Sequence, residues 1–220
     1  MKLPERGQSG DWLVQGPAGQ IEVLLSAPRG TEPAAGCALI CHPHPLFGGA
    51  MGNKVVYTLA AAANKAGLYA LRFNFRGVGR SAGLHDEGRG EARDLLFLAE
   101  TLRGLLTGGR LVLAGFSFGA YVALKAAAEA RPDALVSIAP PFGKYFGGEA
   151  PPAHPHCPWL VIHSRDDDTV SYAETHETLM GYEPPPELVT VDGAGHFFHG
   201  RLSDIGDSVL PFLQRHIGGG

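Results

Sequence analysis

The sequence lacks any long apolar run. No stretch approaches the roughly 20 apolar residues that a membrane-spanning helix needs. Residues 1–10 carry charges and a proline in place of the apolar segment of a signal peptide. We therefore expect a soluble, cytoplasmic protein with no membrane partner.

The chain also lacks a basic block. Its 220 residues include 18 Lys and Arg against 22 Asp and Glu, giving a formal net charge of -4, and both signs are scattered. Proteins that bind nucleic acids usually concentrate cations on one face or in one segment. We expect no nucleic-acid partner, and a small neutral molecule as the ligand instead.

Cysteine is scarce, and internal repeats and low-complexity tracts are absent. Cys37, Cys41 and Cys157 are an odd number and too few for a disulfide scaffold, which agrees with a reducing compartment. A chain of this length is typical of one α/β domain with its own core, so we treat residues 1–220 as a single domain. We expect a monomer.

Short apolar segments alternate with helical patterns along most of the chain. Apolar runs predict strands over residues 21–27, 37–41, 68–75, 111–114, 134–139, 159–163 and 187–191. Helical spacing of apolar residues predicts helices over 53–66, 90–106, 118–130, 171–180 and 203–217. The alternation indicates an α/β fold with a mostly parallel central sheet and helices on both faces. Pro211 predicts a kink in the last helix or a later start for it.

The segment Gly115-Phe116-Ser117-Phe118-Gly119 joins a predicted strand to a predicted helix. In that setting G-x-S-x-G forms a nucleophile elbow, a turn so tight that glycine is favoured two positions either side of the serine. The turn strains the backbone of Ser117 and exposes its hydroxyl at the positive end of the helix. The pentapeptide alone is a weak indication, because 31 glycines make chance matches common.

A serine nucleophile needs a base within hydrogen-bond reach and a carboxylate that orients the base. In a parallel sheet, reactive groups lie beyond the carboxyl ends of the strands. His196 follows the last predicted strand, while Asp166, Asp167 and Asp168 follow the strand that ends at His163. Each aspartate could instead be a solvated residue that caps the next helix, so this reasoning leaves all three open.

The order serine, acid, histidine is that of the α/β-hydrolase fold. Four stretches make the sequence resemble a small lidless bacterial α/β-hydrolase related to the dienelactone-hydrolase-like serine esterases: 41–49 (CHPHPLFGG), 74–81 (NFRGVGRS), 115–119 (GFSFG) and 195–199 (GHFFH). The resemblance covers residues from about 37 to 199 and implies a single-domain α/β-hydrolase fold. It implies no lid domain, because only about twenty residues connect the strand ending near 139 to that starting near 159.

The resemblance also assigns roles to residues. It implies Ser117 as the nucleophile and His196 as the general base of a catalytic triad. Family members commonly show His-Gly-x-x-Asp-x-x-Val at this point of the chain, with the acid as its Asp, and residues 163–170 match this pattern with Ser164 in place of glycine. That register selects Asp167 as the acid, with Asp168 as the second candidate.

In this fold, the oxyanion hole uses the backbone N–H after the nucleophile and one N–H from the loop that follows the 37–41 strand. The first donor is therefore Phe118. His44 is our first choice for the second donor and Leu46 the alternative, because Pro43 and Pro45 have no N–H.

Aromatic residues near these segments are candidates for the walls of an open substrate pocket, with core packing as the alternative role for each. The main candidates are Phe47, Phe142, Tyr145 and Phe197, followed by Phe118 and Phe146.

Two groups of residues together have the composition of one metal site, namely Cys41, His42 and His44, and His154, His156 and Cys157. The first group follows a strand and the second precedes one, so a parallel sheet places them at opposite ends. We expect no metal and no other cofactor. We interpret His42 as a structural loop residue and Cys41 as a buried thiol.

These features predict a cofactor-independent serine hydrolase that cleaves carboxylic esters or thioesters of a small acyl substrate through an acyl-enzyme. A peptidase or amidase of the same fold is the alternative enzyme, although nothing in the sequence suggests a peptide-binding edge. A non-catalytic binding module is the third possibility, and we would expect it to have lost one triad position.

Overall fold

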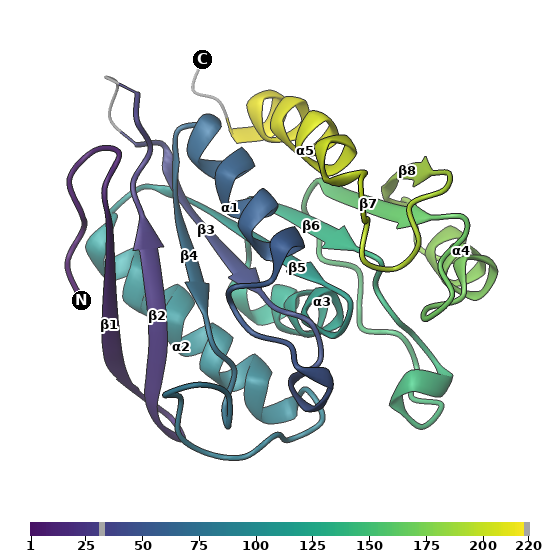
Figure 1. Ribbon diagram of the computed structural model, residues 1–220, viewed down its shortest axis with the longest axis horizontal. Helices are drawn as coiled ribbons and strands as arrows, with labels where there is room; N and C mark the ends of the chain where they lie inside the picture. The colour runs from purple at the N-terminus through teal and green to yellow at the C-terminus, as the bar shows by residue number, and fades with distance from the viewer. Residues whose placement is uncertain (31–33, 218–220) are drawn as a thin grey trace.

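The computed structural model describes residues 1–30 and 34–217. Within them, eight strands form one sheet in the order β1-β2-β4-β3-β5-β6-β7-β8, and helices cover both of its faces (Figure 1). The strands are β1 (Ser9–Gly16), β2 (Gly19–Ser26), β3 (Gly36–Cys41), β4 (Leu68–Phe73), β5 (Arg110–Phe116), β6 (Ala134–Ile138), β7 (Trp159–Ser164) and β8 (Glu187–Val191).

Five α-helices and two short 3₁₀ turns connect the strands of the described chain. The helices are α1 (Lys54–Lys65), α2 (Arg89–Leu105), α3 (Phe118–Ala130), α4 (Tyr172–Met180) and α5 (Leu202–Ile217), and the turns are η1 (Pro45–Phe47) and η2 (Lys144–Phe146). None of the described helices is both long and apolar enough to cross a lipid bilayer.

The strands from β3 onward run parallel to one another, while β2 pairs antiparallel with both β1 and β4. Every residue of β3, β6 and β7 is buried, because helices pack on both faces of the parallel part of the sheet. The predicted α/β architecture is therefore confirmed, and the connection between β6 and β7 contains only η2 and no lid domain.

β1 is a strand that the apolar runs do not predict. It pairs with β2 along its whole length, from Ser9 opposite Ser26 to Gly16 opposite Gly19. Its residues alternate between exposed and half-buried because β1 is an edge strand with one face in solvent. Such a segment carries a weak apolar signal, and the pairing with β2 stabilises it.

α5 corrects a second expectation. It begins at Leu202, so Pro211 lies inside the helix and does not mark its start. The proline removes one backbone donor, but Val209, Phe212 and Leu213 around it are buried. Packing of this apolar face keeps the segment helical despite the poor propensity of proline.

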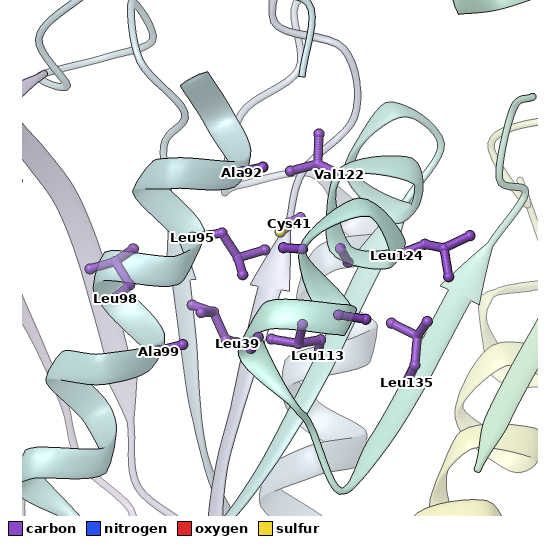
Figure 2. Packing of buried hydrophobic residues seen from close by; sticks show 14 of the residues in the cluster. Leu39, Cys41, Ala92, Leu95, Leu98, Ala99, Leu113, Val122, Leu124 and Leu135 are labelled. Carbon is purple, nitrogen blue, oxygen red and sulfur yellow. The ribbon is translucent and has the colours of Figure 1, made fainter. Parts of the chain in front are cut away.

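Two hydrophobic layers hold the helices to the sheet. In Figure 2, side chains of β3 and β5 such as Leu39 and Leu113 meet side chains of α2 and α3 such as Leu95 and Val122. On the other face, α1 packs over β3, β4 and β5, and α5 packs over β6 and β7. Fully burying one such leucine stabilises the fold by about 1.5–3 kcal/mol.

The strand order determines where the loops at the end of the sheet diverge to leave a crevice. From β3 the chain crosses to β4 on one side, and from β4 it returns past β3 to β5 on the other side. The loops that follow β3 and β5 therefore diverge at the carboxyl ends of two adjacent parallel strands, where ligands bind in open α/β sheets.

Candidate active site

Ser117 occupies the turn between β5 and α3. Its backbone has φ 53° and ψ -123°, a strained conformation for a residue with a side chain. Its N–H donates to the carbonyl oxygen of Ile138 at 2.8 Å, which ties the turn to β6. The side chain is thus held at the N-terminus of α3, where the helix dipole favours negative charge.

Two glycines make this turn possible. A Cβ atom on Gly115 would lie closer than 3.0 Å to the carbonyl oxygen of Gly119. A Cβ atom on Gly119 would lie equally close to the carbonyl oxygens of Cys41 and His42. The elbow is therefore packed directly against the end of β3, with no room for a methyl group at either position.

His196 lies between Ser117 and Asp167. Its Nε2 is 3.1 Å from the hydroxyl oxygen of Ser117, and its Nδ1 is 2.8 Å from Oδ2 of Asp167. The imidazole is buried and packs against Phe116 and Phe197, with ring centroids at 5.0 and 5.1 Å. With Nδ1 protonated toward Asp167, Nε2 is free to accept the proton of the serine hydroxyl.

Four hydrogen bonds reach the carboxylate of Asp167. Oδ2 accepts from His196 and from Nε2 of His163 at 3.2 Å, while Oδ1 accepts from the backbone N–H groups of Thr169 and Val170 at 2.9 and 2.7 Å. Burial disfavours the charged form, but these hydrogen bonds outweigh burial and hold the pKa of Asp167 below its ordinary value. Asp167 is therefore a carboxylate at neutral pH.

The two neighbouring aspartates point elsewhere. The carboxylate of Asp166 accepts from the N–H of Gly193 at 2.5 Å. Asp168 is exposed, and its carboxylate accepts from the hydroxyl of Thr169 at 3.3 Å. Only Asp167 of the three is brought to His196.

The loop after β3 faces the elbow through His44, whose ring centroid is 4.8 Å from that of Phe118. The N–H of Leu46 donates to Nδ1 of His44 at 3.2 Å and is thereby occupied. Among the described residues, no hydrogen-bond acceptor is found for the N–H of His44 or of Phe118. One unused backbone donor therefore directly follows Ser117 in the chain, and the other belongs to the residue whose ring packs on Phe118.

His42 fixes this loop to the neighbouring strand end. Its Nδ1 donates to the carbonyl oxygen of Pro43 at 2.6 Å, and its Nε2 accepts from the N–H of Phe75 at 2.9 Å. Burial lowers the pKa of His42 to about 4, so the ring is neutral at pH 7. These contacts agree with the structural role expected for it.

The three cysteines are free thiols. Cys37 and Cys41 are buried, and burial raises the pKa of Cys37 to about 12 and that of Cys41 above its ordinary value. Burial likewise raises the pKa of Cys157 to about 12. Within residues 1–30 and 34–217, no group of three or more His, Cys, Asp or Glu side chains is arranged to hold a metal ion.

Comparison with known proteins places this geometry in a family, although no protein-family model matches the chain. The uncharacterized protein RP471 of Rickettsia prowazekii (strain Madrid E) is 32% identical over 212 residues, which cover 90% of this chain and 86% of the relative. The crystal structure of XC6422 from Xanthomonas campestris, an α/β serine hydrolase without a lid, is 38% identical, with a TM-score of 0.89. That match covers 100% of this chain and 99% of XC6422. The chain belongs to the lidless α/β serine hydrolases.

A second solved structure supports the same assignment. An α/β serine hydrolase homologue from Coxiella burnetii is 41% identical, with a TM-score of 0.85, over 93% of this chain and 97% of that one. The resemblance inferred from the sequence motifs is thus confirmed.

In this lidless hydrolase, the aromatic wall candidates lie in different places. Phe47 is 86% exposed on η1, with its ring centroid 4.8 Å from that of His44, and Phe197 is 49% exposed beside His196. Phe142 is buried in the core. The hydroxyl of Tyr145 donates to the carbonyl oxygen of Thr169 at 2.8 Å. Phe47 therefore lies beside His44 and Phe197 beside His196, while Tyr145 lines a cavity together with Asp167.

Phe118 and Phe146, the two further wall candidates, stack on each other with ring centroids 6.2 Å apart. Phe118 itself is buried against Phe75, so only its edge can face the crevice.

The sequence pattern assigns no role to His163, yet its ring donates to Asp167. Its Nε2 also lies 3.1 Å from the carbonyl oxygen of Val170, so one proton is shared between two acceptors. Its Nδ1 is buried without a hydrogen-bond partner. The signal was present, because His163 is the first residue of the motif that selects Asp167.

His85 and Glu91 form a second unpredicted contact of this lidless hydrolase. Nδ1 of His85 lies 3.0 Å from the buried carboxylate of Glu91, and its ring lies beside His44 and Phe118, with centroids at 4.8 and 5.4 Å. No local pattern predicts this, because the loop before α2 reaches the oxyanion loop only in the folded chain.

Proposed function

We propose that this chain cleaves carboxylic esters or thioesters through an acyl-enzyme, with Ser117 as nucleophile, His196 as general base and Asp167 as the orienting acid. One observation carries the proposal. A continuous series of hydrogen bonds links the three side chains, at 3.1 Å between Ser117 and His196 and 2.8 Å between His196 and Asp167. Those distances suit proton transfer from a serine hydroxyl.

In the first half-reaction, the hydroxyl oxygen of Ser117 attacks the carbonyl carbon of the substrate while Nε2 of His196 takes the hydroxyl proton. The tetrahedral intermediate then collapses, and His196 returns that proton to the leaving alcohol or thiol. Water repeats the sequence on the acyl-enzyme, releasing the carboxylic acid and regenerating Ser117. The ionised Asp167 stabilises the imidazolium in both halves.

The N–H groups of Phe118 and His44 bind the oxyanion in this proposal. Both lack an acceptor among the described residues, whereas the N–H of Leu46 is used by the ring of His44. The loss of one oxyanion donor typically costs about 3 kcal/mol of transition-state stabilisation. His44 is therefore a better second donor than Leu46.

An exposed apolar border favours an acyl substrate. Phe47 and Phe197 are 86% and 49% exposed next to His44 and His196, and no lid covers them. Apolar walls with a few convergent polar groups are the usual composition of small-molecule sites. This arrangement suits an acyl group that approaches from solvent.

The proposal is tested with a fluorophosphonate probe and with ester and thioester series of increasing acyl-chain length. Wild-type protein should be labelled and should turn over short-chain substrates. Ser117→Ala should lose both activities while keeping a native circular dichroism spectrum. The exposed Ser203→Ala is the matched control and should retain both.

Two results would count against the proposal. Unchanged turnover in Ser117→Ala would exclude Ser117 as the nucleophile. A well-folded wild-type protein that is neither labelled nor active on any ester or thioester would instead favour a non-catalytic module.

A further inference from the structure

A cavity of about 490 Å³ lies apart from the Ser117 site. It is bordered by one side of α1, by the end of β2 at Ser26 and by the start of β1 at Ser9, and Arg72 of β4 also lines it. In Figure 1, α1 covers one face of the sheet, and β3 separates β1, β2 and β4 from β5 in the strand order. The volume is in the range of small-molecule sites.

The charged side chains that line this cavity are all cationic, namely Arg29, Lys65 and Arg72. We call it the basic cavity. The carboxylate of Glu5 accepts from Gln8, which lines the cavity, but Glu5 itself does not line it. Among residues 1–30 and 34–217, no lining carboxylate neutralises the three cations.

Arg72 differs from the other arginines of the described chain. Eight of them, at positions 76, 80, 89, 103, 110, 165, 201 and 215, pair with a carboxylate. Those left unpaired, at positions 6, 29, 93 and 131, are exposed, whereas Arg72 is partly buried and has no carboxylate partner among the described residues. A partly buried cation without a counter-charge is unfavourable.

The contacts of Arg72 satisfy only part of its guanidinium. Nη1 donates to the carbonyl oxygen of Met51 at 3.0 Å, and the group lies over the ring of Tyr57 at 5.4 Å. Its Nε is buried without an acceptor. Burial lowers the pKa of Arg72, as expected where the charge is incompletely compensated.

Two neutral polar side chains of the basic cavity, Ser26 and Asn64, already have partners. The hydroxyl of Ser26 donates to Oδ1 of Asn64 at 2.8 Å. The amide nitrogen of Asn64 donates to the carbonyl oxygens of Ser26 and Leu68. The hydrogen-bond donors that line the cavity are therefore mainly cationic. A complementary ligand must supply hydrogen-bond acceptors and negative charge.

An apolar wall stands beside the cations. Tyr57, Ala60 and Ala61 of α1 line the same cavity. A simple inorganic anion would leave this wall and most of the volume unused, whereas a molecule with an anionic group and an apolar part would contact both.

We propose that the basic cavity binds a small organic phosphate. Arg29, Lys65 and Arg72 hold the phosphate, whose multiple charge and several acceptor oxygens match three cations better than a single carboxylate does. The organic part lies against Tyr57, Ala60 and Ala61. This site is separate from Ser117 and does not depend on the proposed hydrolase reaction.

The test is a titration of the full chain with phenyl phosphate, inorganic phosphate, benzoate and benzyl alcohol, followed by amide chemical shifts and calorimetry. Phenyl phosphate should bind at least tenfold more tightly than any of the other three, and its affinity should fall as salt rises. Shifts should centre on the amides of Tyr57, Ala61 and Asn64.

Two double variants locate the site. Arg29→Ala/Lys65→Ala removes exposed cavity cations, and should weaken phenyl phosphate binding at least tenfold. Lys54→Ala/Arg93→Ala removes the same charge from exposed positions outside the cavity, and should change affinity less than twofold. Ser117→Ala should bind as wild type does.

Four outcomes would overturn the assignment. They are absence of phenyl phosphate binding, equal affinity in the two double variants, loss of binding in Ser117→Ala, and equal affinity for phenyl phosphate and one of the other three compounds.

Discussion

The Ser117 site and the basic cavity differ in how far their charged groups are compensated by partners in the chain. The carboxylate of Asp167 receives four hydrogen bonds from its own chain, and two of them come from imidazoles. The guanidinium of Arg72 has no carboxylate partner among the described residues, and its Nε has no hydrogen-bond acceptor. The first arrangement is complete before a ligand arrives, while the second still requires negative charge.

This difference follows from what each region has to do. A nucleophile and its base must be oriented before the substrate binds, because reorganisation during the reaction raises the barrier. A binding cavity can leave its charge uncompensated, since the ligand then supplies the missing interaction and gains affinity from it. Four predictions test this contrast.

The largest expected effect is that of Asp167→Asn on turnover. An amide cannot stabilise the imidazolium or hold the required tautomer, so kcat for an ester substrate should fall by about 10⁴-fold. Steady-state kinetics measures this. Asp168→Asn is the matched control and should stay within about twofold of wild type, since Asp168 does not reach His196. If Asp167→Asn kept a tenth of the activity, the acid would lie elsewhere.

Gly119→Ala should destabilise the fold, because its Cβ would collide with the carbonyl oxygens at the end of β3. We expect a loss of about 3 kcal/mol in the free energy of unfolding, at the upper end of the range for overpacking. Urea unfolding measures it. Gly104→Ala in α2, where a Cβ meets no atom within 4 Å, should instead gain about 0.5–1 kcal/mol. Equal stability of the two variants would show that the elbow does not touch β3.

His42 gives a pH-dependent effect at the same loop. Burial depresses its pKa from 6.5 to about 4, so protonation favours the unfolded chain. Its stabilising contribution is complete above pH 6.5 and is lost as the pH falls toward 4. We expect it to account for about 2–3 kcal/mol of lost stability between pH 7 and pH 4.5.

Urea unfolding at both pH values checks this expectation. His42→Gln should reduce the stability difference between pH 7 and pH 4.5, and the exposed His199→Gln should leave it unchanged. A wild-type difference that persists in full in His42→Gln would assign it to other groups.

The smallest effect is expected for Arg72→Met without ligand. Loss of the hydrogen bond to Met51 is offset by removal of an unpaired, partly buried charge, so stability should change by less than about 1 kcal/mol. Added phenyl phosphate should raise the melting temperature of wild type and not that of the variant. A loss above 3 kcal/mol without ligand would show that Arg72 is already compensated within the chain.

The sequence predicts the parallel part of the fold well because each element there carries its own pattern. A short apolar run such as β3, or a helix of small residues such as α3, has a local residue pattern that predicts its burial. The apolar pattern does not predict β1, because its stability comes from pairing with β2 and its large apolar residues are only Trp12, Leu13 and Val14. Pro211 misleads for a similar reason, since burial of the residues around it overrides propensity.

For the candidate site, the motifs select Ser117, His196 and Asp167, and the folded chain brings these three side chains together. The motifs do not reveal the second histidine on Asp167, nor the position of His85 beside His44. Phe142 is a candidate wall residue that the motifs do not place correctly by themselves. It is an aromatic residue near the site in sequence, yet it is buried in the core.

By itself, the sequence determined the order of the strands and helices, the turn around Ser117 and the residues that can follow each strand end, because these depend on local sterics and apolar periodicity. Tertiary structure alone decided which backbone N–H groups stay unused and which cations share a cavity. The basic cavity draws residues from β1, β2, α1 and β4. No local pattern encodes such a site, since burial and charge compensation exist only after distant segments have packed.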